Sequence, residues 1–330
     1  MPLATPSGHI DAMPQTALLA NHPVSTTPPL AVVPPPPSAP EVVEPVDNDG
    51  RSVAGWMRSR CIGEGTFAVV YQARPATCPE DSPADYAIKI LRPAFHSDPA
   101  AIRTMQREAY VGRSVTHPHL LSVLSASLDT APYFVVSPYL SGATLADVLR
   151  FRGRLRVPLA LWVTRQVAEA LACLHESGWV HRDIKPANIM MSENGHCTLI
   201  DLGFALHADD AAAGLSAALE GSLQYTAPEI FLSRGSVTPR SDIYSLGIVL
   251  YELLSGYRPF GSTDPALIIE SHLREVAPKI RQRCPHVPVE AAHLVHQMLA
   301  KDPLRRPPTC RDLVEQLVQL EIETFTDRGW

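Results

Sequence analysis

After about residue 56, the chain shows short runs in which hydrophobic and polar residues alternate. Alternation over such short lengths is typical of half-buried β-strands. The predicted strands are 68–73, 86–91, 121–125 and 133–137. Residues 99–114 have helical periodicity instead. The apolar face of that predicted helix carries Ile102, Met105, Ala109 and Gly112. This part of the chain therefore predicts a small β-rich lobe with one main helix.

Helical periodicity dominates after about residue 141. Apolar residues at i, i+4, i+7, i+8 and i+11 predict an amphipathic helix whose stripe faces a core. These residues are Val163, Val167, Ala170, Leu171 and Leu174. Later helices are predicted at 239–256, 264–274, 289–300 and 309–322. The apolar run 243–254 indicates that the first of these later helices is buried. Strands followed by helices favour an α+β fold in two lobes.

The first 50 residues differ from the rest in composition. They hold 12 of the 32 prolines, four of them consecutive at 34–37, and no aromatic residue. A segment with so few large apolar groups cannot offset the entropy lost on ordering, so we predict a disordered Pro-rich tail over 1–50. The tail is either simply solvated or functional, as a polyproline II segment that binds a ligand or as a phosphorylated segment. Composition does not separate these alternatives.

Charge and cysteine content restrict the class of protein. The net charge is −6, but residues after 50 carry 29 acids against 28 bases, which gives no sign of an electrostatic nucleic-acid binder. The six cysteines are scattered without a C-x-x-C pair, as is typical of reduced thiols. No basic N-terminal region precedes an apolar stretch, and no apolar run approaches the roughly 18–20 residues of a membrane span. We therefore expect a cytoplasmic protein without a membrane span.

The segment 181–188, His-Arg-Asp-Ile-Lys-Pro-Ala-Asn, concentrates side chains that phosphoryl transfer requires. It places the Asp183 carboxylate and the Asn188 carboxamide five residues apart, with Lys185 between them. Asp201 follows Asn188 by thirteen residues, at the end of an apolar run. Transfer from a metal–nucleotide complex needs an acceptor for the hydroxyl proton, oxygens for Mg²⁺ and a cation at the phosphate. These residues can supply all three.

Two further motifs precede this segment. Gly63 and Gly65 would let backbone N–H groups approach phosphates closely, although such a glycine pair is a weak signal alone. The β-type residues that follow speak against a dinucleotide fold, in which a helix would follow. Lys89 lies among apolar residues of the 86–91 strand, where it is either a surface lysine or needs a carboxylate partner. Glu108, on the predicted helix, is the natural partner.

The order of these motifs resembles that of the eukaryotic-type (Hanks-type) serine/threonine protein kinases. Along the chain come the glycine-rich segment, Ala87-Ile88-Lys89, Glu108, His181-Arg182-Asp183, Asp201-Leu202-Gly203 and Ala227-Pro228-Glu229. The resemblance covers about residues 56–320 and implies a bilobal α+β fold. It implies a β-rich N-lobe over about 56–138, a helical C-lobe over about 139–320 and a short tail over 321–330.

The resemblance implies catalytic and metal-binding roles by position. Asp183 would accept the proton of the substrate hydroxyl, and Lys185 would neutralise charge on the γ-phosphate. Asn188 would be the third catalytic residue, beside Asp183 and Lys185. Asn188 and Asp201 would bind Mg²⁺, so ATP and Mg²⁺ are the expected cofactors.

Nucleotide-binding and scaffold positions follow in the same way. Lys89, paired with Glu108, would hold the α- and β-phosphates. The remaining nucleotide-binding positions are Ile62, Gly63, Glu64, Gly65, Thr66, Phe67, Ala68, Val70, Ala87, Ser137, Tyr139 and Met190. Of these, Val70, Ala87 and Met190 would enclose the adenine, and the backbone of 137–140 would hydrogen-bond to it. Asp242, Glu229 and Arg306 match scaffold positions, the last two as a buried ion pair.

The substrate class also follows from the resemblance. A lysine at position 185, two residues after Asp183, resembles the pattern of the serine/threonine class, because tyrosine-specific members usually have an arginine nearby instead. The Ala-Pro-Glu segment at 227–229 favours a protein substrate, because small-molecule kinases of related fold lack it. We expect transfer to Ser and Thr hydroxyls of proteins, including self-phosphorylation. A pseudokinase scaffold and a Pro-rich docking protein without turnover remain alternatives, although none of the usual catalytic residues is missing.

We expect activity to be regulated through the loop between the Asp-Leu-Gly and Ala-Pro-Glu motifs. Arg182 implies that a phosphate orders this loop, yet the usual threonine position falls near Ala218. The nearby hydroxyls belong to Ser216, Ser222 and Thr226, and fixed charges could come from Asp209, Asp210 or Glu220. We predict Ser216 as the regulatory site. Ser222 matches a hydroxyl position that contacts the catalytic Asp and Lys.

Two small residues lead to a hypothesis about activation. Gly112 should face the core where the family usually has a larger apolar side chain, and Ser137 aligns with the residue that blocks the pocket behind the adenine. We expect a cavity and a loosely held 99–114 helix, on which an activator or a second copy would press. Gly112→Leu should then raise basal activity and melting temperature. The alternative is that neighbours such as Tyr110 or Phe134 fill the space.

Overall fold

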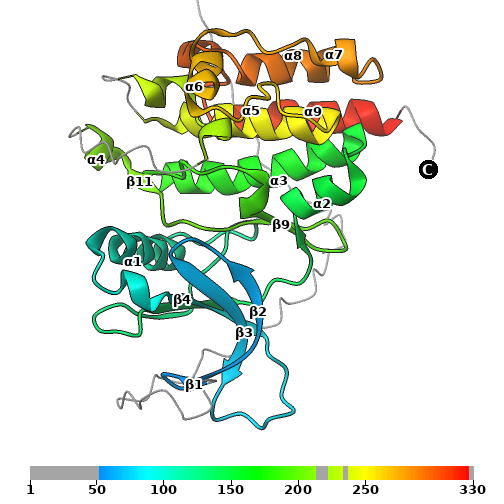
Figure 1. Cartoon of the computed structure of the whole chain (residues 1–330). Helices are drawn as coiled ribbons and strands as arrows, with labels where there is room; N and C mark the ends of the chain where they lie inside the picture. Colours follow the sequence, from blue (N-terminus) through cyan, green and yellow to red (C-terminus); the bar gives the residue numbers. More distant parts are fainter. Residues whose placement is uncertain (1–51, 213–221, 233–236, 327–330) are drawn as a thin grey trace, which may run out of the picture. The chain divides into compact units, whose positions relative to one another are not determined.

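The computed structural model of the chain describes residues 52–212, 222–232 and 237–326 (Figure 1). All of them belong to one contiguous unit, Ala39–Trp330. The predictions for the tail over 1–50 and for Ser216 lie outside the described residues.

Six strands form an antiparallel sheet in the first half of the described chain, in the order β1-β2-β3-β4-β6-β5. Their bounds are β1 Ser52–Val53, β2 Trp56–Glu64, β3 Ala68–Pro75, β4 Tyr86–Leu91, β5 Ser125–Ser127 and β6 Phe134–Pro138. Alternation thus predicts β3, β4 and β6 to within two residues. The sheet buries Val53, Ala73, Ile88, Phe134 and Val136 in one cluster.

The predicted strand at 121–125 is wrong in place, since β5 begins only at Ser125. The apolar run instead connects two parts of the fold. The Leu121 N–H donates to the Leu199 carbonyl at 2.9 Å, and the Val123 N–H donates to the Gly112 carbonyl at 2.9 Å. These residues are apolar because they lie between packed elements, a situation that alternation alone does not distinguish from a strand.

The helix α1, Pro99–Ser114, has the predicted bounds. It begins at a good capping sequence: the Asp98 side chain accepts a hydrogen bond from the Ala100 N–H at 2.9 Å, and Pro99 occupies the first helical position. Its buried face includes Met105 and Ala109, which join a second cluster in this lobe with residues of β4 and β6. The periodicity that predicted α1 therefore corresponds to a real buried stripe.

Val123 fills the space beside Gly112, so the predicted cavity is wrong. A Cβ built on Gly112 would lie 2.6 Å from Val123 Cγ2, a distance that real Cβ atoms essentially never show. Tyr110, one of the suggested fillers, is 63% exposed, and Phe134 belongs to the other cluster of this lobe. A cavity beside Gly112 is therefore not what determines how tightly α1 is held. Gly112→Leu would overpack this site rather than fill it.

Helices make up most of the second half of the described chain (Figure 1). Their bounds are α2 Leu145–Arg152, α3 Val157–Glu176, α4 Ala208–Ala212, α5 Pro239–Ser255, α6 Pro265–Arg274, α7 Ile280–Arg283, α8 Val289–Met298 and α9 Cys310–Thr326. The predicted helices at 239–256, 264–274, 289–300 and 309–322 correspond to α5, α6, α8 and α9. Fourteen residues of α5 are buried, as its apolar run predicted. α9 continues to Thr326, into the segment expected to be a short tail.

α3 carries the stripe predicted from Val163 to Leu174 and packs against α5 and α9. By length and composition it could also cross a membrane, so the statement that no apolar run approaches that length is wrong for this helix. However, 61% of its apolar window is buried inside the protein. A core helix passes the same test, and the packing of α3 identifies it as one.

Short elements connect the two lobes and carry the polar motifs. β7 Ala143–Thr144, β9 Ile189–Met191 and β10 Cys197–Leu199 form one small sheet, and β8 Trp179–Val180 and β11 Leu206–His207 form another. The 3₁₀ helices are η1 Pro93–Phe95, η2 Pro186–Asn188, η3 Leu223–Tyr225, η4 Pro228–Phe231 and η5 Pro303–Arg305. The segment 181–188 therefore lies between β8 and β9, and Asp201 lies between β10 and β11.

Candidate active site

The buried helix α5 holds the segment 181–188 in place through Asp242. The Asp242 side chain accepts hydrogen bonds from the N–H groups of His181 and Arg182, each at 2.8 Å, and lies 2.8 Å from His175 Nε2. Arg182 has a φ of 73°, in the left-handed region that costs energy for a residue with a side chain. Burial raises the pKa of Asp242, but its hydrogen bond and charge interaction with His175 and the His181 charge outweigh burial and lower it. Asp242 is therefore an anion that fixes the turn before Asp183.

Asp183 is the centre of a network of short polar contacts. Its Oδ2 accepts from Lys185 Nζ at 2.6 Å and from Asn188 Nδ2 at 2.8 Å, and its Oδ1 accepts from the Ser222 N–H at 3.2 Å. Only 3% of Asp183 is exposed. Ser222 reaches Asp183 through its backbone, whereas the sequence predicted a contact of its hydroxyl. The carboxylate is thus oriented by three donors and remains an acceptor.

Lys89 pairs with one carboxylate from each lobe. Its Nζ lies 2.6 Å from Glu108 Oε2, as predicted, and 3.2 Å from Asp201 Oδ1. Burial lowers the pKa of Lys89, but the charges of Asp201 and Glu108 outweigh burial and raise it well above its ordinary value. Burial likewise raises the pKa of Asp201, while Lys89 lowers it to a net value below the usual range. Lys89 is therefore a fixed cation between α1 and the Asp-Leu-Gly segment.

The donor set for a divalent cation lies beside these groups. The Asn188 amide nitrogen donates to Asp183, so its oxygen is the atom left for a metal. Asp201 uses Oδ1 for Lys89 and keeps Oδ2. The Ile200 N–H donates to the Asn188 carbonyl at 2.9 Å, which brings the two ligand residues together. Carboxylate and amide oxygens suit Mg²⁺, so these residues fit the metal.

The glycine-rich segment forms the end of β2 and a turn into β3. The Gly65 N–H donates to the Ala68 carbonyl at 2.9 Å, and Thr66 lies within the turn. Ile62 and Phe67 are each 38% exposed, leaving apolar surface on this turn and on the end of β2. Glu64 and Ala68 end and begin the two strands.

Arg92, which the sequence analysis missed, ties this turn to β4. Its Nη2 lies 3.2 Å from Glu64 Oε2 and its Nε donates to the Gly65 carbonyl at 3.2 Å. The Arg92 N–H donates to the Phe67 carbonyl at 2.8 Å. The only sequence signal for this role is a basic residue directly after a predicted strand, which is too common to be informative.

Two of the residues expected to enclose the adenine, Val70 and Ala87, lie on the neighbouring strands β3 and β4. Val70 pairs with Lys89 across β3 and β4, and Ala87 pairs with Ser137 across β4 and β6. Ser137 is 8% exposed, so this small side chain is a buried part of β6. Met190 lies on β9, in the chain's second lobe.

Tyr139 contributes less to an adenine site than predicted. Its N–H donates to the Asp85 carbonyl at 2.8 Å and is therefore unavailable to a base. Its hydroxyl accepts from Arg60 Nη2 at 2.9 Å. Backbone hydrogen bonds to adenine must come from other groups of 137–140.

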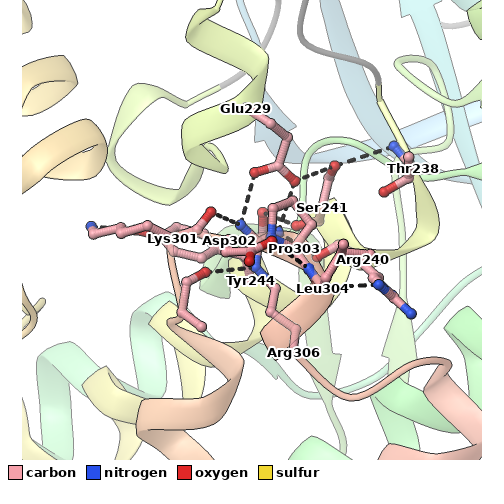
Figure 2. A network of polar contacts seen from close by, with 12 residues as sticks. Glu229, Thr238, Arg240, Ser241, Tyr244, Lys301, Asp302, Pro303, Leu304 and Arg306 are labelled. Atoms are coloured by element: carbon pink, nitrogen blue, oxygen red, sulfur yellow. Dashed lines mark hydrogen bonds and ion pairs between the residues drawn. The ribbon is translucent and has the colours of Figure 1, made fainter.

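A buried ion pair anchors the Ala-Pro-Glu segment, as the sequence predicted. Glu229 accepts from both terminal nitrogens of Arg306, at 2.7 and 2.8 Å (Figure 2). Ser241 Oγ donates to Glu229 at 2.7 Å, and Arg306 also donates to the carbonyls of Ala300 and Lys301. The Arg306 side chain has no exposed surface. The bidentate pair fixes η4 to η5 and α5.

The hydroxyls near this anchor are already engaged. Thr226 Oγ1 donates to the Ser222 carbonyl at 3.2 Å, and the Tyr225 hydroxyl donates to Glu252 at 2.7 Å. These contacts shape the segment in front of Asp183. The phosphorylation of Ser222 or Thr226 stays a prediction.

These features define a bilobal fold in which contacts between the lobes bring Lys89, Asp183, Asn188 and Asp201 together. Residues 56–319 match the protein kinase domain family. The chain belongs to this family.

Several curated bacterial proteins are similar to the chain. They include the serine/threonine-protein kinase PrkC of Bacillus subtilis (34% identity over 266 residues, covering 80% of the chain and 40% of PrkC) and PknB of Mycobacterium leprae (34% over 266 residues, covering 78% and 42%). A probable serine/threonine-protein kinase of Clostridium perfringens is 32% identical over 263 residues, covering 79% of the chain and 38% of that protein. The chain thus matches about two-fifths of the length of these relatives.

Proposed function

We propose that the chain is an active serine/threonine protein kinase that transfers the γ-phosphoryl group of ATP to Ser and Thr hydroxyls of proteins. The observation that carries this proposal is the Asp183 carboxylate, held by Lys185 at 2.6 Å and by Asn188 at 2.8 Å. A pseudokinase would be expected to lack Lys89, Asp183 or Asp201, and all three are present in mutual contact networks.

The geometry supports a distinct role for each residue. Asp183 would accept the hydroxyl proton while Lys185, already at its carboxylate, would neutralise charge on the transferred group. Lys89 would hold the α- and β-phosphates, since Glu108 and Asp201 keep its ammonium charged and fixed. Asn188 and Asp201 would hold Mg²⁺, which supplies electrostatic stabilisation of the phosphates when bound.

Partners and location belong to the same proposal. Protein substrates would lie against the segment formed by η3 and η4, where Ser222 contacts Asp183. We propose a cytoplasmic location, in keeping with the unpaired cysteines of the described residues. Self-phosphorylation, an activator or a second copy at α1 and a ligand of the Pro-rich tail are further proposals.

The test is phosphate incorporation from Mg-ATP into a generic protein substrate. Asp183→Ala should reduce the rate on the order of 10²–10⁴-fold, because it removes the general base. Asp129→Ala is the matched control, since this aspartate is exposed on the loop after β5 and should leave the rate unchanged. Incorporation that survives Asp183→Ala contradicts the assignment. A wild-type protein without incorporation favours a scaffold, and label on tyrosine contradicts the substrate class.

A further inference from the structure

Two segments of the C-lobe contain arginines and lysine but no acidic residue. Residues 148–168 include five arginines and residues 276–289 include Lys279, Arg281 and Arg283, with no Asp or Glu in either segment. The chain after residue 50 as a whole carries 29 acids against 28 bases. Positive charge is therefore concentrated in these two segments.

The two segments meet in the folded protein. Arg154 Nη1 lies 3.9 Å from Cys284 Sγ, directly after Arg283. The Arg283 guanidinium lies 5.9 Å from the centre of the Tyr257 ring. α2 ends within the first segment and α7 lies within the second, and both are drawn toward the right of Figure 1.

We define the basic surface by the exposed arginines of these segments that are not used in ion pairs within the described residues. It comprises Arg152, Arg154, Arg156, Arg281 and Arg283. Arg150 is left out because it pairs with Asp147 at 2.8 Å. Arg165 is left out because it binds Glu169 and Glu321.

Two exposed aromatic side chains lie on the basic surface. Phe151 is 89% exposed and stands between two arginines in sequence, and Tyr257 is 66% exposed. Phe151 therefore projects into solvent, whereas Tyr257 and Arg283 line a surface hollow together with Glu252. Arginines around exposed aromatic rings suit the boundary of an anionic bilayer, where guanidinium groups meet phosphates and rings enter the acyl region.

We propose that the basic surface docks on a membrane that contains anionic phospholipids, with Phe151 inserted into the boundary region. Charge complementarity supplies the attraction, and the protruding ring supplies the apolar contact. An acidic peptide fits less well, because the hollow beside Tyr257 and Arg283 is also lined by the Glu252 carboxylate, and Phe151 lies outside this hollow. None of the residues involved belongs to the candidate active site, so docking would leave that site open.

The test is sedimentation of the full chain with vesicles. Phosphatidylcholine vesicles should bind little, and vesicles that also contain phosphatidylglycerol should bind well at low salt and less as salt rises. Arg152→Gln together with Arg281→Gln should weaken this binding about 25-fold, at about fivefold per arginine. Phe151→Ser should weaken binding most at high salt, where the apolar contact dominates.

The matched control is Arg103→Gln together with Arg113→Gln, two exposed arginines on α1 that change the net charge equally. Equal weakening by both double variants would show that only net charge matters and would overturn the proposal. Failure to bind the phosphatidylglycerol vesicles, or tighter binding to polyglutamate or single-stranded DNA at the same salt, would also overturn it. Binding is measured without ATP, so the result is independent of kinase activity.

Discussion

At the scale of single residues, His272 links burial to acid stability. Its ring is fully buried beside Phe260, and its Nδ1 lies 2.9 Å from the Tyr244 hydroxyl. Burial, helped by the positive charge of Lys301, lowers the pKa of His272 to about 4 from its usual 6.5. The unfolded chain binds this proton more readily than the folded protein, so stability is present above pH 6.5 and is lost as the pH falls toward 4.

This residue gives a prediction for pH dependence. Lowering the pH from 7 to 5 should cost about 2 kcal/mol of unfolding free energy through His272. His272→Gln should be less sensitive to this change, although it should also be less stable at pH 7. Urea unfolding at the two pH values measures the difference. His293→Gln, at an exposed position, serves as the control and should keep the wild-type dependence; identical dependence in all three proteins would contradict the role of His272.

At the scale of elements, the packing of α1 determines how well Glu108 reaches Lys89. Gly112 lets α1 approach Val123 so closely that a Cβ would collide with it at 2.6 Å. Gly112→Leu should therefore destabilise the protein by roughly 1–3 kcal/mol through overpacking, and should lower activity because α1 carries Glu108. Thermal unfolding and the kinase rate are the measurements.

Arg113→Leu is the matched control for this prediction, because it adds the same side chain at the next, exposed position of α1. It should change stability and activity little. A Gly112→Leu protein that melts higher and works faster would restore the hypothesis of a cavity beside α1.

The Glu229–Arg306 pair connects η4, η5 and α5. Glu229→Gln would leave a guanidinium with no exposed surface without its carboxylate, at a cost of about 3–5 kcal/mol. Adding Arg306→Met should recover part of that loss, because the unpaired buried charge is then removed. Denaturant unfolding of the two variants tests this order of stabilities.

Arg305→Met is the control for the ion pair, since the neighbouring Arg305 side chain is 82% exposed. Its unfolding free energy should stay close to that of the wild type. If Glu229→Gln unfolds like Arg305→Met, the buried pair does not anchor the segment.

At the scale of the whole described unit, the sequence predicted best where the signal is local. α1 and α5 follow from periodicity and apolar runs, and the partners of Lys89 and Glu229 follow from motif order. The strand expected at 121–125 fails because those residues are buried by contacts with Leu199 and Gly112, which are distant in sequence.

The errors in the candidate site have the same origin. Ser222 uses its N–H rather than its hydroxyl, and the Tyr139 N–H is taken by Asp85. Which backbone group faces a side chain depends on the path of the chain, and residue types do not encode it directly. Arg92 was missed for the same reason, because its partners are set by the fold of β2 and β3 around it.

The contact between Gly112 and Val123 also bears on how the chain can change through evolution. The two positions share one volume, so a larger side chain at 112 becomes acceptable only when 123 becomes smaller. Related chains should therefore exchange bulk between these positions, and a single step in either direction should be selected against until the other position follows.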